Sequence, residues 1–377
     1  MKVFYEISPE IPKNCVATVG VFDGVHTGHQ YIIDQVKLMA ENSGFEELVI
    51  TMNPHPAEFF GRKISLLSTM DEKLALFDRF GVRNLLVLNF NSEIAALSGT
   101  RFIDDILVSR LSVSRLLLGY NNSIGHKENG VSEIFSGKIP VSRLDRFHLD
   151  YSDDISSSSI RNLLANGDVS TANRFLGYKY SITGKVVHGR GVGHTIGFPT
   201  ANIEISDSRK VVPANGVYVV LASVDGKCYE SMLNIGYCPT FDGKSQSIEL
   251  HMLGCSADLY GKEVKVSFCS RIRVEQKFND VESLVNQLNK DRAVVDAPYA
   301  GIDRDVILYL TVVPQHHVRR NHHVLTDVTV LTDHTTTHYM TEMPNLRAFA
   351  YLASFVYVRR LMYKIVHYCV TVSICLA

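Results

Sequence analysis

Several features that mark other classes of protein are missing from this chain of 377 residues. Tryptophan is absent, which excludes little because 17 tyrosines and 18 phenylalanines remain. The seven cysteines form no Cys-x-x-Cys pair, and an odd number in a large chain indicates reduced thiols rather than a disulfide framework. The formal net charge of −1 argues against a broad surface for nucleic acid, so any nucleotide is expected to bind at a local site.

Long apolar runs are also missing. The apolar stretches 348–358 and 365–377 are each too short to span a membrane, and the start of the chain turns acidic before any apolar run develops. We therefore expect no signal peptide, no membrane span and a cytoplasmic location. The length allows two or three domains, and 46% hydrophobic with 20% charged residues is typical of a globular protein.

The first 165 residues alternate between strand-like and helix-like segments. Apolar strands are predicted at 16–22, 47–52, 84–88 and 114–119, with helices from residue 30, at 71–80 and at 102–111. This alternation predicts an α/β domain with a mainly parallel sheet and helices on both faces. Ligands in such folds bind beyond the carboxyl ends of the strands, where His26, His29, His55 and Gly119 fall.

From about residue 178 onward, short predicted strands are separated by glycine, aspartate and proline turns. We expect an antiparallel barrel, a closing helix at 281–289, and linker positions at 166–168 and Gly177. The strands are predicted at 180–188, 217–224, 228–234, 247–252 and 263–270.

The tail beyond residue 296 holds seven of the fifteen histidines and has no sustained hydrophobic period. The histidine pairs 316–317 and 322–323 lack further ligands at the spacing of a metal site, so no function is assigned to this tail.

The most informative segment runs from Val16 to Gln30. An apolar strand breaks at Asp23 and Gly24, and two histidines follow near the start of a predicted helix, with a glycine between them. A strand, a glycine turn and a helix start aim backbone N–H groups and the positive helix end at a bound group, which suits a phosphate. The alternative is that one histidine caps the helix and the other lies at the surface.

With these segments in view, residues 1 to about 295 resemble the bacterial bifunctional riboflavin kinase/FMN adenylyltransferases, also called FAD synthetases. The resemblance rests on two sets of motifs in the family's order. The first set is GVFDGVHTGHQ (20–30), NPHP (53–56), LLLGYNNSIGHKENG (116–130) and ISSSSIRNLL (155–164). The second is GFPTANI (197–203), NIGYCPTF (234–241), IELHML (248–253), DLYGKEVKV (258–266) and RVEQKF (273–278).

This resemblance implies a Rossmann-like HxGH nucleotidyltransferase domain at 1–168 and a small antiparallel β-barrel riboflavin kinase domain at 175–295, followed by an atypical tail at 296–377. The implied function is two-step FAD biosynthesis: ATP-dependent phosphorylation of riboflavin to FMN, then adenylylation of FMN with release of pyrophosphate. The implied ligands are riboflavin, FMN, FAD and ATP, with Mg²⁺ as cofactor.

For the first domain, the resemblance implies that His26, His29 and Arg161 are catalytic. The attacking FMN phosphate is already anionic, so alignment and charge stabilisation are needed rather than a general base. A guanidinium suits the β- and γ-phosphates, although Arg161 taken alone reads as a solvated helix residue. The implied ATP- and phosphate-binding residues are Phe22, Asp23, Gly24, Gly28, Ser156 and Ser157.

For the barrel, the resemblance implies Glu249 as proton acceptor, because the nucleophile is a neutral alcohol. Taken alone, Glu249 reads as a surface carboxylate on an edge strand. Thr200 and Asn202 are implied as ligands of Mg²⁺ and phosphate. The remaining implied residues are Gly189 and Gly197 around a glycine-rich phosphate loop, with Asn121 and Arg273 in flavin binding.

Three departures from the family pattern stand out. Asn121 replaces a frequent acidic residue, Ser158 and Ser159 replace Thr and Arg, and Gly254-Cys255 replaces Asp-Phe. Asn121 and the tail leave room for a non-catalytic flavin-binding or regulatory protein, against which the retained site residues argue. A second alternative, an HxGH nucleotidyltransferase acting on another phosphorylated acceptor, is opposed by the motifs of the second domain.

Overall fold

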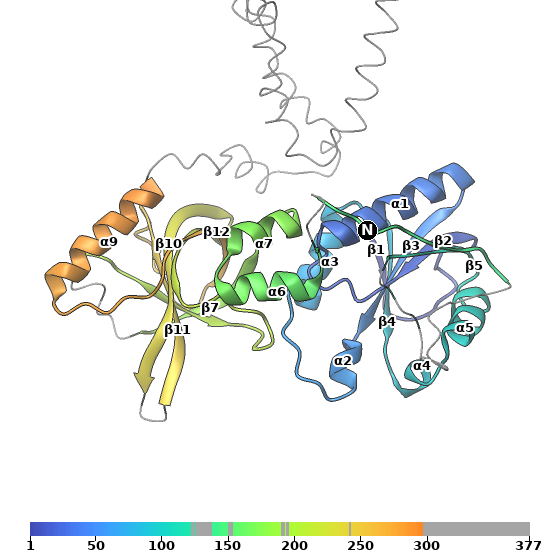
Figure 1. Cartoon of the computed structure of the whole chain (residues 1–377), viewed down its shortest axis with the longest axis horizontal. Helices are drawn as coiled ribbons and strands as arrows, with labels where there is room; N and C mark the ends of the chain where they lie inside the picture. The colour runs from blue at the N-terminus through green and yellow to red at the C-terminus, as the bar shows by residue number, and fades with distance from the viewer. Residues whose placement is uncertain are drawn as a thin grey trace, which may run out of the picture. The chain divides into compact units, whose positions relative to one another are not determined.

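The computed structural model of the chain describes residues 1–120, 122, 124, 138–149, 154–189, 193, 196–240 and 243–296 (Figure 1). The predicted tail, Asn121 and most of the segment that follows it lie outside these residues. Within the described part, no helix combines the length and the apolarity that a bilayer crossing requires.

The N-terminal part contains a six-stranded parallel sheet, as the alternating pattern predicts. The strands lie in the order β1-β4-β3-β2-β5-β6, and every pairing is parallel. Successive strands β2, β3 and β4 move outward in one direction, and β5 then pairs on the other side of β2, which makes the gap between β2 and β5 the topological switch point. The strands are β1 (Lys2–Phe4), β2 (Cys15–Val19), β3 (Glu46–Asn53), β4 (Asn84–Asn89), β5 (Val113–Leu118) and β6 (Val141–Arg143).

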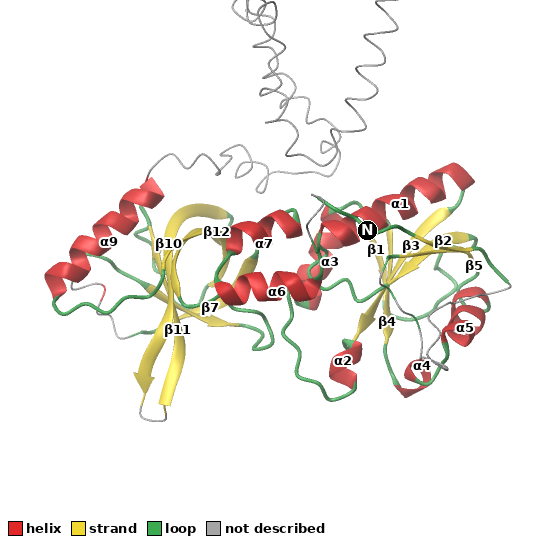
Figure 2. Cartoon of the chain, viewed as in Figure 1, coloured by secondary structure: helices red, strands yellow, loops and turns green. Residues whose placement is uncertain are grey.

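Both faces of this sheet are covered by helices (Figure 2). Alternate residues of β3 show this: Val49 packs with Ile33 and Phe77, whereas Leu48 packs on the other side with Phe102. The helices are α1 (Thr27–Ser43), α2 (Pro56–Phe59), α3 (Met70–Arg79), α4 (Ser92–Ala95), α5 (Gly99–Arg101) and the π-helix η1 (Phe102–Val108). The single helix predicted at 102–111 is thus a short α-helix continued as a π-helix.

The predicted linker positions, 166–168 and Gly177, lie at the ends of two helices, α6 (Ser157–Asn166) and α7 (Val169–Leu176). Each ends at a glycine in the left-handed conformation, Gly167 at φ 79° and Gly177 at φ 73°, which only glycine adopts without strain. Ile160 and Leu176 belong to the same buried cluster as the interior of the barrel. These helices are therefore part of a packed core and not a flexible connection.

The C-terminal part is a closed antiparallel barrel, as predicted, with strand order β10-β11-β8-β7-β12-β9. Its interior holds large side chains such as Tyr218 and Phe268, whose rings meet edge to face at 5.3 Å. The strands are β7 (Ser181–Val187), β8 (Ala201–Ile205), β9 (Gly216–Val224), β10 (Lys227–Thr240), β11 (Gly243–Met252) and β12 (Glu263–Arg273). The predicted closing helix is α9 (Val281–Asp296), and β8 is a strand that the sequence pattern did not predict.

A buried ion pair between Asp291 of α9 and Arg273 of β12 holds the helix against the barrel. Asp291 is 1% exposed, and both of its oxygens lie 3.0–3.1 Å from Nε of Arg273, with Nη2 at 2.8 Å. Breaking a buried pair by removing one partner leaves an uncompensated charge, which costs about 3–5 kcal/mol.

We expect Asp291→Ala to lower the free energy of unfolding by an amount of this order, measured by urea denaturation. The matched control is Arg292→Gln on the next residue, whose pair with Asp296 is half exposed on both sides and is worth about 0.3–0.5 kcal/mol. Equal effects of the two substitutions would contradict the anchoring role of Asp291.

Candidate functional sites

The turn that follows β2 lies at the switch point of the sheet and has an unusual backbone. Phe22 has φ 53° and Val25 has φ 35°, a region that bulky and β-branched residues avoid, while Gly24 between them has φ 78°. Such conformations persist only where the surroundings fix them, and they concentrate at functional sites.

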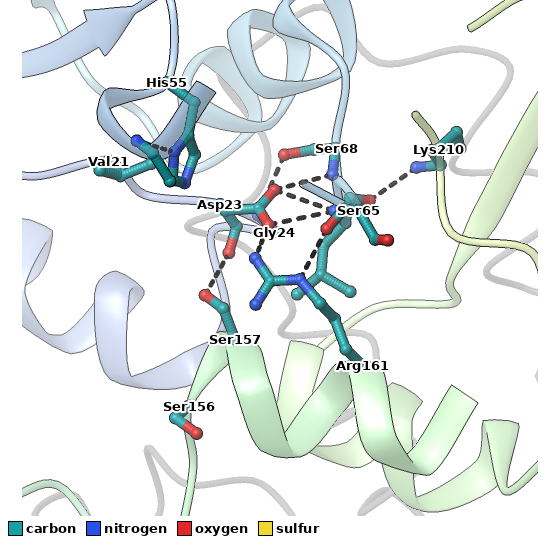
Figure 3. A network of polar contacts seen from close by, with 12 residues as sticks. Val21, Asp23, Gly24, His55, Ser65, Ser68, Ser156, Ser157, Arg161 and Lys210 are labelled. Carbon is teal, nitrogen blue, oxygen red and sulfur yellow. Dashed lines mark hydrogen bonds and ion pairs between the residues drawn. The ribbon is translucent and has the colours of Figure 1, made fainter. Parts of the chain in front are cut away.

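The side chain of Asp23 makes the contacts that fix this turn (Figure 3). Its carboxylate is 3% exposed and accepts the backbone N–H groups of Leu67 and Ser68 at 3.0–3.1 Å. Nη2 of Arg161 lies 2.6 Å from the same carboxylate, and Nε of Arg161 donates to the carbonyl of Ser65 at 2.6 Å. One buried carboxylate thus joins the turn, the segment 65–69 and helix α6.

The backbone atoms of the turn are bonded as well. Ser157 donates to the carbonyl of Asp23 at 2.9 Å, and Gly24 donates to the hydroxyl of Ser68 at 3.0 Å. Tyr178 donates to the carbonyl of Gly24 at 2.6 Å. The carbonyl of Val21 accepts from the buried amine of Lys73 at 2.9 Å and from Thr51 at 3.1 Å. These contacts compensate for the strained φ angles.

The two histidines stack on each other beside this turn. Their ring centroids are 3.6 Å apart with an angle of 20° between the planes, and the ring of Phe22 meets His29 edge to face at 5.1 Å. His26 occupies the N-cap position of α1 and is 6% exposed. The prediction that the histidines lie together at the helix start is confirmed, and the alternative of one surface histidine is wrong.

Burial keeps both imidazoles neutral. It lowers the pKa of His26 to about 4, with Asp23 opposing the shift, and it lowers the pKa of His29 well below 6.5, reinforced by His26 and Lys73. In the described structure the Nδ1 atoms of both rings are buried without a hydrogen-bond partner. Buried polar atoms of this kind are rare and typical of sites that a ligand or water completes. The rings are therefore suited to donate hydrogen bonds rather than to carry charge.

A cavity of about 490 Å³ opens beside the histidines, within the range of small-molecule sites. It is lined from the start of α1 by His26, Gly28 and His29, from the end of β5 by Gly119, and from the start of α6 by Ser156–Ser158. The structure thus brings together residues separated by 130 positions in the sequence at the carboxyl edge of the sheet. This cavity is our candidate nucleotide site.

Several predicted residues of this site act through packing or backbone support. Phe22 is 2% exposed and supports His29, and a Cβ on Gly28 would lie 3.3 Å from the His26 ring. Ser156 caps α6 in a reciprocal arrangement with Ser159, so one of the residues that departs from the family pattern completes a capping box. Nε and Nη2 of Arg161 bind Ser65 and Asp23. Its binding to the phosphates of ATP stays a prediction.

In the barrel, a row of polar side chains crosses three adjacent strands. Glu249 on β11 is directly opposite Asn202 on β8 and Asn234 on β10. Residues opposite each other in antiparallel strands point to the same side, and Ile248 and Leu250 are buried in the barrel interior, so this row lies on the outer face. Glu249 is half-buried there, and burial raises the pKa of its carboxyl group above 4.5.

The loop before β8 is held against this row. His251 places Nδ1 2.7 Å from the carbonyl of Pro199, which only accepts, so Nδ1 carries the proton. A Cβ on Gly189 would clash with the side-chain amide of Asn202, and one on Gly193 would lie 3.2 Å from the hydroxyl of Thr200. At Gly189 the side chain of Asn202 leaves no room for a Cβ, and at Gly193 the backbone carbonyl of Phe198 does so, with Thr200 next to it.

Gly197 ends this loop at φ 81°, with open space where a side chain would be. Among the described contacts, the guanidinium of Arg273 is bound to Asp291, and its predicted role toward the flavin stays a prediction.

The comparisons with known proteins agree with this arrangement of two sites. A family model described as FAD synthetase matches residues 8–158, and one described as riboflavin kinase matches residues 176–298. The bifunctional riboflavin kinase/FMN adenylyltransferase of Bacillus subtilis (strain 168) is 38% identical over 298 residues, covering 76% of this chain and 93% of the relative. The chain belongs to the bifunctional riboflavin kinase/FMN adenylyltransferase family.

Other members of the bifunctional riboflavin kinase/FMN adenylyltransferase family show the same extent of similarity. The enzyme of Listeria monocytogenes is 36% identical over 298 residues, covering 77% of this chain and 94% of its own. Among solved structures, a macrolide-efflux protein from Streptococcus pneumoniae aligns with a TM-score of 0.69 and 29% identity, covering 78% of this chain and 99% of that chain.

Some site residues of this bifunctional enzyme were missed by sequence reasoning. The turn after β2 is supported by Lys73, the segment 65–69 and Tyr178. Of these, only the capping box Thr69-x-x-Glu72 is recognisable in the sequence. Asn234 and His251 lie inside motifs quoted above, but their roles depend on strand register. Arg143 on β6, which donates to the carbonyls of Gly119, Tyr120 and Asn122, has no local signal.

The low pKa of His26 predicts a pH-dependent stability. Between pH 6.5 and about 4 the unfolded chain binds a proton at this residue and the folded chain does not, so the free energy of unfolding falls as the pH falls. The loss attributable to His26 is up to about 3 kcal/mol. We expect His26→Gln to reduce the difference between unfolding free energies measured in urea at pH 7 and pH 5. The exposed His148, changed to Gln, is the control, and an equal pH dependence in both variants would contradict the assignment.

Proposed function

We propose that the two reactions of the family are divided between the two domains. The chain phosphorylates riboflavin to FMN and adenylylates FMN to FAD, as its two family matches and its relatives indicate. Residues 1–168 would carry the adenylyl transfer and residues 175–295 the kinase reaction. The observation that carries this assignment is the cavity at the switch point, lined by two neutral histidines and the start of α6.

In the adenylyl transfer, a phosphate oxygen of FMN attacks the α-phosphorus of ATP, and the bond to the leaving pyrophosphate breaks. The nucleophile is already an anion, so the site needs donors at fixed positions and no proton acceptor. His26 and His29 supply neutral N–H donors, and their stacking and their contact with Phe22 fix the ring planes. The ion pair of Asp23 and Arg161 fixes the turn that leads into His26 at the start of α1. Arg161 is also proposed to contact the phosphates.

In the kinase reaction, the 5′-hydroxyl oxygen of riboflavin attacks the γ-phosphorus of ATP, and ADP leaves. The hydroxyl proton passes to Glu249, whose pKa is raised by burial, which makes it a stronger base than an exposed carboxylate. Asn202 and Asn234 flank Glu249 on the neighbouring strands and limit the directions that it can take.

Two residues at the start of β8, Thr200 just before the strand and Asn202 on it, fit a magnesium ion. The hydroxyl of Thr200 and the amide oxygen of Asn202 are hard oxygen ligands, and the glycine loop lies directly against both side chains. When bound there, Mg²⁺ would neutralise charge on the phosphates of ATP. His251 would keep the loop in place through Pro199. We place the enzyme in the cytoplasm, where riboflavin and ATP meet, and assign no role to the tail at 296–377.

The direct test is to incubate the purified full chain with riboflavin, ATP and Mg²⁺ and to separate the flavins over time by chromatography. We expect FMN to appear first and FAD later. FMN without FAD would contradict the adenylyl transfer and direct attention to Asn121 and the serine motif. No conversion of riboflavin would overturn the proposal in favour of a non-catalytic flavin-binding protein.

Glu249→Gln separates the two activities. Loss of a positioned proton acceptor lowers a rate by about 10²–10⁴-fold, so we expect FMN formation to fall by this amount while FAD formation from added FMN is unchanged. Burial raises the pKa of Glu249, so this carboxylate is protonated at a higher pH than an ordinary one. We therefore expect the kinase rate of the wild type to begin its decline, on acidification, at that higher pH. Glu204→Gln, on the exposed side of β8, is the matched control. An unchanged rate of FMN formation in Glu249→Gln would refute the assignment of the base.

A further inference from the structure

The buried amine of Lys210 links the barrel to the turn after β2, residues 22–25, which lies beside the candidate nucleotide site of the other domain. Lys210 lies in the connection between β8 and β9 and is 6% exposed. Its Nζ lies 2.6 Å from the carbonyl oxygen of Leu67 and 2.5 Å from Oε2 of Glu72, with the ring centroid of Tyr180 at 4.6 Å. Burying an ammonium group costs its hydration, which is compensated only where its partners are well placed. The contact is therefore specific.

The segment 65–69 lies between Lys210 and the turn. The N–H of Leu67 donates to Asp23, and the carbonyl of the same residue accepts from Lys210. The backbone adds two further bonds, from Leu66 N–H to the carbonyl of Arg209 at 2.7 Å and from Val211 N–H to the carbonyl of Leu66 at 2.9 Å. Segment 65–69 is thus bonded on one side by the barrel and on the other by Asp23.

The turn depends on this segment for its shape. Two backbone N–H groups of the segment hold the Asp23 carboxylate, Ser68 accepts from Gly24, and the carbonyl of Ser65 holds Arg161. A Cβ on Gly24 would lie 2.9 Å from the side chain of Leu67, so the packing between the two is already tight. A displacement of the segment therefore moves the carboxylate that positions the turn beneath His26.

We propose that Lys210, a residue of the kinase domain, is a positioning residue for adenylyl transfer. The barrel, through Lys210, keeps segment 65–69 in the position that Asp23 and Arg161 require. This inference rests on the proposed function. It also implies that the nucleotide site of the first domain is complete only when the barrel is folded against it, and the described residues of both domains belong to one compact unit.

The test compares Lys210→Met with Arg209→Gln in the full chain. Methionine keeps much of the length and loses the charge and the donors. Arg209 is the matched control: it is adjacent, half exposed, and bridges to Glu58 of the first domain at 2.7 Å. FAD formation from FMN and FMN formation from riboflavin are measured on the same preparations, each with varied ATP. Exchange of the amide hydrogens in segment 65–69 is followed in parallel.

For Lys210→Met we expect a rise of about tenfold in the KM for ATP in FAD formation and a fall of about 10–100-fold in kcat/KM, since small misplacements cost this much. FMN formation should stay within about twofold of the wild type, and exchange in segment 65–69 should accelerate because opening of the segment becomes easier. Arg209→Gln should change none of these. Unchanged FAD formation, or a parallel loss of both activities, would overturn the proposal.

A double variant separates positioning from simple destabilisation. Lys210→Met leaves the carboxylate of Glu72 without the cation that it pairs with, and adding Glu72→Gln removes that charge while glutamine still completes the capping box of α3. We expect thermal stability to recover in the double variant and the defect in FAD formation to persist, because the Leu67 carbonyl still lacks its donor. Recovery of both would overturn the proposal. A wild-type chain that forms neither FMN nor FAD would refute the proposed function instead.

Discussion

The buried carboxylate of Asp23 is the interaction on which the first site depends. Three donors from two segments, 65–69 and helix α6, meet on it, and its own backbone carbonyl is bonded to α6 as well, through Ser157. The positive φ angles of Phe22 and Val25 are tolerated because the surrounding contacts fix them. Removing the carboxylate would take away the acceptor that the segment 65–69 and helix α6 share, so one buried side chain organises elements from distant parts of the sequence.

In the proposed mechanism the two sites meet opposite electrostatic requirements. Adenylyl transfer starts from an anionic nucleophile, and the first site offers neutral imidazoles whose burial prevents them from taking a proton. Phosphorylation of an alcohol needs a base, and the barrel offers a carboxylate that burial makes more basic. Desolvation serves both sites because it disfavours the charged form of either group.

Local features of the sequence were sufficient to predict much of this enzyme. The apolar run before Asp23, the glycines of the turn and the spacing of the histidines are contiguous, and the strand–turn–helix unit was predicted correctly. Strand β8 was missed because it is short, only partly buried and preceded by a glycine-rich loop. The contacts of Lys210 with Leu67 and Glu72 join residues about 140 positions apart, and no local pattern encodes such a pairing.

The closed barrel has one more consequence for the kinase site. Side chains along a strand alternate between the interior and the outer face, so a shift of β11 by one residue would exchange Glu249 with its apolar neighbours. Closure leaves no free edge along which β11 could slide, and Ile248 and Leu250 fix it from inside. The placement of the proposed proton acceptor, Glu249, is therefore an outcome of hydrophobic packing on the opposite side of the sheet, because the apolar interior of the barrel fixes the register of β11.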